Sequence, residues 1–172
     1  VEPAPPPILS PDGSVAVRYL VNGAMEVTRR ADGGRWEVLT QGSYPAVSPD
    51  NRRLLWNVFY SDILPGAQPP IMEVWISNLD GTVQRLVHRQ SAGWSVWLDA
   101  RRLLIGKRIP YQAEEQLYIL DVDDPNMAPQ LLGEYRFLRG VEVAPGGGRI
   151  AFYLPFQDDA NASGVYVQDT QI

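Results

Sequence analysis

The sequence predicts an all-β fold, and three observations support that prediction. Gly and Pro number 15 each among 172 residues, and so many turn-forming residues suit short strands joined by tight turns. Apolar runs of strand length alternate with Asp-Gly and related pairs, which are a strong signal for β-hairpins. No segment combines a 3.6-residue apolar stripe with capping residues, so helices are not expected.

One motif recurs four times along the chain: an apolar strand, a turn of the Pro-Asp-Gly kind and a second apolar strand. The turns are centred on Asp12, Asp50, Asp99 and Gly146, so that they lie 38, 49 and 47 residues apart. A period of about 40–45 residues with loops of variable length is typical of a β-propeller blade. The third copy diverges most, because Trp97 and the residue after it replace Ser-Pro.

A third strand follows each unit, and usually a second turn and a fourth strand. In the second repeat these strands are expected at Glu73–Ser77 and Val83–Val87, on either side of Asp80 and Gly81. The predicted fold is therefore a β-propeller with about four blades of four-stranded antiparallel sheets. The blades are expected at 8–42, 43–90, 91–136 and 137–172, after a proline-rich linker at 1–7.

The last blade lacks its fourth strand in this prediction. Propellers often complete such a blade with a strand from the opposite terminus, but the proline tract at residues 1–7 can hardly donate ladder hydrogen bonds. Three interpretations remain open. The four blades belong to a larger propeller, two chains join into an eight-bladed ring, or a four-bladed ring closes imperfectly.

The segment Ser48-Pro49-Asp50-Asn51, followed by a strand and then by Asn78-Leu79-Asp80-Gly81, resembles TolB-type propeller repeats. Such repeats also occur in the propeller domains of prolyl-oligopeptidase-like enzymes. The resemblance extends over residues 8–170 and is strongest in the second repeat. It implies a propeller fold and protein–protein interaction, and it leaves the partner open because one fold serves many functions.

Composition excludes several classes of function. The net charge is −5 and there is no cysteine. A nucleic-acid partner is not expected, because phosphate binding needs a basic face and the basic residues here cluster no further than adjacent arginine pairs. Without cysteine there is no disulfide framework and no thiolate nucleophile. Membrane insertion is not expected either, since no run of about 18 apolar residues occurs.

Little in the sequence indicates catalysis, so neither an enzyme nor a cofactor is expected. His88 is the only histidine, and a catalytic triad or a histidine metal site needs partners that the chain scarcely provides. Asp159-x-Asn161-x-Ser163-Gly164 resembles the start of a calcium loop but lacks the later acidic ligand. A polar hairpin loop is the interpretation. The five tryptophans lie on predicted strands and are interpreted as core between sheets.

Three long loops, at Tyr60–Pro70, Pro110–Gln116 and Pro155–Ser163, are expected on one rim of the propeller, where binding usually occurs. Aromatic anchors beside acidic residues suit a protein or peptide partner with basic character. The alternative is that these loops are merely variable and solvated. The candidate binding residues are Tyr60, Ile63, Leu64, Tyr111, Glu114, Glu115, Phe156, Asp158 and Asp159.

The functional hypothesis is a non-catalytic protein-binding or scaffolding module. It is expected outside the cytoplasm, in the periplasm or at the cell surface, as a homo-oligomer or as the continuation of a larger propeller. One alternative is the substrate-gating propeller of a larger prolyl-oligopeptidase-like hydrolase. Another is a structural subunit that assembles through the open edge strand of its last blade.

Overall fold

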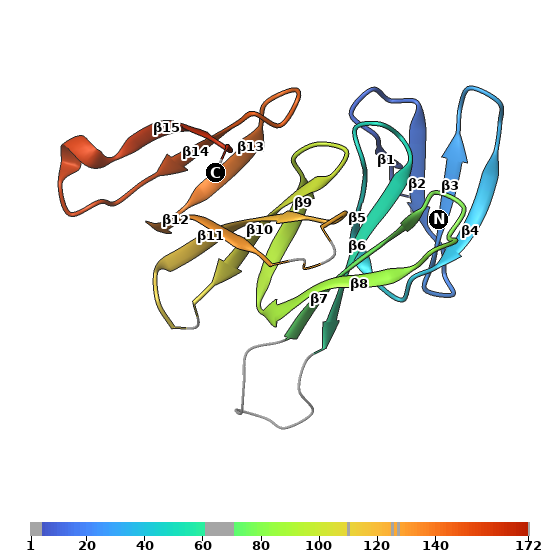
Figure 1. Cartoon of the computed structure of the whole chain (residues 1–172), viewed down its shortest axis with the longest axis horizontal. Helices are drawn as coiled ribbons and strands as arrows, with labels where there is room; N and C mark the ends of the chain where they lie inside the picture. Colours follow the sequence, from blue (N-terminus) through green and yellow to red (C-terminus); the bar gives the residue numbers. More distant parts are fainter. Residues whose placement is uncertain (1–4, 61–70, 110, 125, 127, 172) are drawn as a thin grey trace. The chain divides into compact units, whose positions relative to one another are not determined.

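The computed structural model describes residues 5–60, 71–109, 111–124, 126 and 128–171. In this part of the chain the regular structure consists of fifteen β-strands and a single turn of 3₁₀ helix. The strands form four antiparallel sheets, of which three have four strands and the last has three (Figure 1). The all-β prediction and the incomplete last sheet are thus confirmed. No helix in the described residues has the length and apolar character needed to cross a bilayer.

The chain divides into two compact units. The first contains the residues up to Tyr60 together with Glu73–Arg89, and the second contains Gln90–Ile172. The first unit holds two meandering sheets, whose strands are β1 (Ile8–Leu9), β2 (Val15–Tyr19), β3 (Ala24–Arg29) and β4 (Arg35–Leu39), then β5 (Ser43–Val47), β6 (Arg53–Tyr60), β7 (Ile71–Asn78) and β8 (Arg85–Ser91).

The second unit repeats this plan with one strand fewer. Its strands are β9 (Gly93–Trp97), β10 (Arg102–Arg108), β11 (Glu114–Asp121) and β12 (Gln130–Arg136), then β13 (Arg139–Val143), β14 (Arg149–Leu154) and β15 (Gly164–Asp169). The 3₁₀ turn η1 (Ala160–Ala162) lies between β14 and β15.

Each unit has its own core, to which both of its sheets contribute. In the first unit, Val17 and Val27 pack in one buried cluster with Leu54 and Trp56 of the second sheet. In the second unit the cluster includes Leu104, Leu117, Ile150 and Phe152. The core interpretation of the tryptophans is confirmed: Trp56 and Trp97 are buried, and Trp36, Trp75 and Trp94 are partly buried against these clusters.

The strand β8 differs from its prediction at its start and agrees with it at His88. The fourth strand of the second sheet begins at Arg85 rather than at Val83, because Val83 has a φ of 55° and belongs to the turn. His88 is half-buried on β8, as expected for a strand residue.

The Ser-Pro-Asp turns of the first unit share one hydrogen-bond arrangement. Ser10 Oγ donates to Asp12 Oδ1 (2.8 Å) and accepts the amide of Val15 (3.0 Å). Ser48 Oγ likewise donates to Asp50 Oδ1 (2.6 Å) and accepts the amide of Arg53 (2.9 Å). Both serines are buried, so their hydroxyls need these partners. The motif therefore supplies a small side chain that satisfies the turn from within.

The third turn also satisfies its backbone amides with a side chain, but without a serine. Asp99 Oδ1 accepts the amides of Arg101 and Arg102, each at 2.8 Å. Burial alone would raise the pKa of Asp99, yet these two amides and the Arg102 guanidinium lower it overall. One aspartate thus replaces the Ser-Asp pair, which explains why a divergent copy of the motif still forms a hairpin.

The hydrogen bonds of the Asp12 carboxylate predict that the stability of the first unit depends on acid. Its carboxylate accepts hydrogen bonds from the amide of Ser14, the hydroxyls of Ser10 and Ser14, and the amide group of Asn51, and these hold its pKa well below the usual 3.8. Because the folded pKa is depressed, the stabilisation is present above the unfolded pKa and is lost as the pH falls through the folded one.

We therefore expect Asp12→Asn to flatten the decline of the thermal midpoint below about pH 4. Circular dichroism melts at a series of pH values measure this decline. Glu142→Gln, which removes an exposed carboxyl group on β13, is the control for the loss of one negative charge. An unchanged acid limb in Asp12→Asn would contradict the assignment.

Candidate functional site

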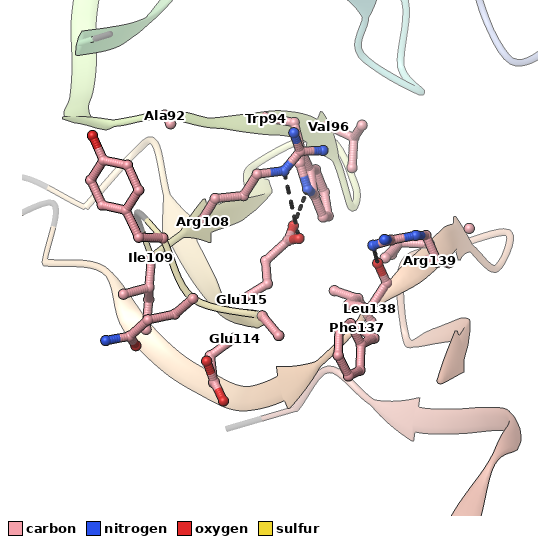
Figure 2. A pocket seen from close by; sticks show the side chains of 15 residues that line it. Ala92, Trp94, Val96, Arg108, Ile109, Glu114, Glu115, Phe137, Leu138 and Arg139 are labelled. Atoms are coloured by element: carbon pink, nitrogen blue, oxygen red, sulfur yellow. Dashed lines mark hydrogen bonds and ion pairs between the residues drawn. The ribbon is translucent and has the colours of Figure 1, made fainter. Parts of the chain in front are cut away.

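A cleft of about 870 Å³ lies in the second unit. It lies where β9 begins, where β10 turns into β11, and where β12 connects to β13 (Figure 2). Its lining combines aromatic, aliphatic and charged side chains, namely Ala92, Trp94, Val96, Arg108, Ile109, Tyr111, Gln112, Ala113, Glu114, Glu115, Phe137, Leu138, Arg139, Gly140 and Val141.

Three aromatic residues at this cleft and its edge have a left-handed backbone. The φ angles are 61° at Tyr111, 59° at Phe137 and 56° at Phe156. This region costs an ordinary L-residue about 1–2 kcal/mol, so glycine or asparagine usually occupies it. Tyr111 is 100% exposed and Phe156 is 80% exposed, so burial does not repay the cost. Strain of this kind is typical of functional sites.

A buried carboxylate forms the floor of the cleft. Glu115 is only 7% exposed. It accepts a hydrogen bond from the indole Nε1 of Trp94 and lies 3.8 Å from Nε of Arg108, its cross-strand neighbour on β10. Figure 2 shows both contacts as dashed lines that converge on the carboxylate. Glu115 therefore fixes the positions of the Trp94 ring and the Arg108 side chain.

A second charged group lies at the edge. Arg136 Nε is 3.9 Å from Oε1 of Glu114, and Arg136 Nη1 is 3.0 Å from Oδ1 of Asp158. The same guanidinium carbon lies 5.0 Å from the ring centroid of Phe137, and Phe156 meets that ring edge-on at 6.2 Å. Three acidic residues of the predicted site, Glu114, Glu115 and Asp158, are thus paired with arginines.

The structure brings together part of the predicted site. Tyr111, Glu114 and Glu115 line the cleft, and Phe156 and Asp158 are joined to its edge through Phe137 and Arg136.

Among the described residues of the predicted site, Asp159 does not take part in these contacts. Asp159 points back into its own loop, where Oδ1 accepts the amide of Asn161 at 2.9 Å. Ile63 and Leu64 lie outside the described residues.

Tyr60 belongs to the first unit, where its hydroxyl donates to Glu73 Oε2 at 3.2 Å. Desolvation and this hydrogen bond raise the pKa of Tyr60. It lines a smaller hollow of about 150 Å³ together with Trp56 and Trp75. No group of three or more potential metal-binding side chains of His, Cys, Asp or Glu occurs in the described residues.

Sequence reasoning missed Arg108, Phe137 and Arg139, and it assigned Trp94 to the core alone. Phe137 lies in the short connection between β12 and β13, and Arg139 is the first residue of β13, so loop length gave no signal for either. Gly140, with a φ of 59°, was the available hint that the chain turns sharply there.

No protein-family model and no curated protein sequence matches the chain. Solved structures do match. An acylaminoacyl peptidase from Pyrococcus horikoshii is 17% identical, with a TM-score of 0.69 over 99% of this chain and 31% of that chain. The β-propeller domain of the Trilobed protease from Pyrococcus furiosus is 13% identical, with a TM-score of 0.62 over 96% of this chain and 54% of that chain. A putative TolB from Agrobacterium tumefaciens is 15% identical, with a TM-score of 0.60 over 95% and 57%.

These similarities show that the chain has a β-propeller fold, as its sequence predicts. The chain spans about a third of the length of the peptidase and somewhat more than half of the other two proteins.

Proposed function

We propose that the chain is a non-catalytic β-propeller module that binds a peptide segment of another protein in the cleft of its second unit. The observation that carries the proposal is the pair of strained aromatic residues, Tyr111 and Phe137, on the lining of this cleft. Aromatic residues and arginine are the types enriched at protein-binding sites, where they act as anchors.

The chemistry of the lining favours binding over catalysis. The lining residues include no serine, threonine, cysteine or histidine, so the described cleft lacks the Ser-His and Cys-His pairs of acyl-transfer sites. Its buried carboxylate, Glu115, is held by Trp94 and Arg108.

A second function is favoured by the similarity to peptidases. The chain aligns over 99% of its length with 31% of an acylaminoacyl peptidase. On this basis we propose, as the alternative, that the chain is the propeller portion of a larger hydrolase, in which the same cleft would contact substrate. A fluorophosphonate probe tests this with the full-length product of the gene. Labelling supports the hydrolase, and failure to label contradicts it; this chain alone is expected to stay unlabelled in either case.

The peptide-binding proposal is tested by panning a phage-displayed library of random twelve-residue peptides on the chain. We expect Tyr111→Asn to reduce retention of the selected clones at least about tenfold, because an aromatic anchor contributes about 1–2 kcal/mol or more. Asparagine tolerates a positive φ, so the free energy of unfolding should stay equal or rise by up to about 1 kcal/mol. Urea unfolding measures this second effect.

Tyr153→Asn is the matched control, because Tyr153 is an exposed tyrosine on β14 that does not line the cleft. It should leave retention unchanged. Selected clones that bind Tyr111→Asn as well as they bind the wild type would contradict this cleft as the binding site.

A further inference from the structure

We propose that Arg108 and Arg139 together form a carboxylate-binding pair, so that the peptide held in the cleft presents a free carboxylate to it. This inference rests on the proposed function and names the chemistry of the ligand. The two arginines come from different sheets of the second unit, Arg108 from the end of β10 and Arg139 from the start of β13, and both line the cleft (Figure 2).

Arg139 has no ion-pair partner among the described residues, whereas Arg108 contacts Glu115. Its side chain is exposed, and its Nη1 donates to the carbonyl oxygen of Leu138 at 2.8 Å. Among the described residues no carboxylate lies within 4.0 Å of its guanidinium group. A guanidinium group has five N–H donors, and this bond uses one of them.

Among the described residues, the ion pair of Arg108 is made by its Nε, at the inner end of the guanidinium group. Its Nε approaches Glu115 Oε2 at 3.8 Å, while the side chain is 69% exposed. The other oxygen of Glu115 accepts the indole of Trp94. The contact with Glu115 therefore orients Arg108, and its terminal Nη1 and Nη2 groups remain in position for a second carboxylate. The planar fork of arginine matches a carboxylate in a way that lysine does not.

The net charge around the arginine pair favours a singly charged anion over a doubly charged one. Arg108 and Arg139 carry two positive charges, and Glu115, the carboxylate that contacts Arg108, carries one negative charge. These three side chains together have a net charge of about +1, which one carboxylate neutralises and which a doubly charged phosphate would exceed. Tyr111 and Phe137 lie on the same lining, so the residue that carries the carboxylate should have an apolar neighbour.

Three small probes distinguish the sources of the carboxylate. Acetyl-Gly-Phe with a free C-terminus presents an α-carboxylate, acetyl-Glu-Phe-amide presents a side-chain carboxylate, and acetyl-Gln-Phe-amide presents none. Each is titrated into ¹⁵N-labelled protein. The indole resonance of Trp94 reports on the cleft, because that N–H donates to the same Glu115 that holds Arg108.

We expect one or both carboxylate probes to bind at least about tenfold more tightly than acetyl-Gln-Phe-amide, as a charge-assisted pair allows. Arg139→Gln should remove this preference, and Arg139→Lys should retain part of it. Arg149→Gln is the matched control, because Arg149 is an exposed arginine of the same unit outside the cleft. It should leave all three affinities unchanged.

Equal shifts of the Trp94 resonance by all three probes would overturn the carboxylate inference and leave peptide binding intact. A preference that survives in Arg139→Gln would overturn the role of the arginine pair. If no probe shifts cleft resonances and the library also yields no binders, the proposed function fails with it.

Discussion

Replacing Trp56 by alanine is expected to lower the free energy of unfolding of the first unit by about 3–5 kcal/mol, the range for removing a large aromatic side chain from a core. Trp56 is 1% exposed and packs in the cluster that both sheets of this unit share. Its ring stacks on Trp75 with centroids 6.4 Å apart and an interplanar angle of 14°. Urea unfolding followed by far-ultraviolet circular dichroism measures the loss.

The neighbourhood of Trp56 cannot collapse easily into the space that alanine would leave. A Cβ atom placed on Gly42 would lie 2.4 Å from Cδ1 of Trp56, so the backbone already fits closely against the ring. Such rigid surroundings keep a cavity open, and cavity volume adds to the cost of the lost contacts. Leu39→Ala, on the exposed side of β4, should cost less than about 1 kcal/mol.

The Trp56→Phe variant distinguishes the contribution of ring packing from the cost of the buried indole N–H. Nε1 of Trp56 is buried and has no hydrogen-bond partner among the described residues, and an unpaired buried donor costs about 1–3 kcal/mol. Trp56→Phe keeps most of the ring and removes that donor, so its net cost should be about 1 kcal/mol. If phenylalanine costs as much as alanine, the packing argument is wrong.

The sheets of this protein could be predicted because their signals are local. The turn at Asp12 is determined by residues 10–15, where the buried Ser10 and the Asp12 carboxylate satisfy the backbone. Gly13 and Gly81 adopt φ angles of 73° and 81°, as a glycine after Asp in a hairpin turn should. Each such turn also sets the register of the two strands that it joins.

The cleft could not be predicted in the same way. It depends on Trp94 and Arg139 lining the same cleft, and these residues are far apart in the sequence and come from different sheets. Their proximity follows from packing between sheets, which no local motif encodes. The left-handed backbone of Phe137 could not be predicted from the sequence either, because a positive φ is normally predicted from glycine or asparagine.

Gly106→Ala is expected to destabilise the second unit by about 2–4 kcal/mol and to disrupt the cleft at the same time. Gly106 lies on β10 opposite Trp94 of β9. A Cβ atom there would lie 2.2 Å from Cε2 and 2.4 Å from Nε1 of Trp94. Real Cβ atoms do not approach other atoms so closely, so the indole ring must move.

The ring cannot move without cost, because its N–H is the donor to Glu115. A shifted indole would leave a nearly buried carboxylate with Arg108 alone, and losing a partner of a buried charged group costs more than losing a neutral one. Gly148→Ala is the control, since nothing lies within 4 Å of a Cβ at that exposed position. Urea unfolding should place it within about 0.5 kcal/mol of the wild type, whereas Gly106→Ala should lose stability together with the Trp94 indole resonance shift that carboxylate probes produce. A stable Gly106→Ala protein with an unchanged indole resonance would show that the Trp94–Glu115 contact does not define the cleft.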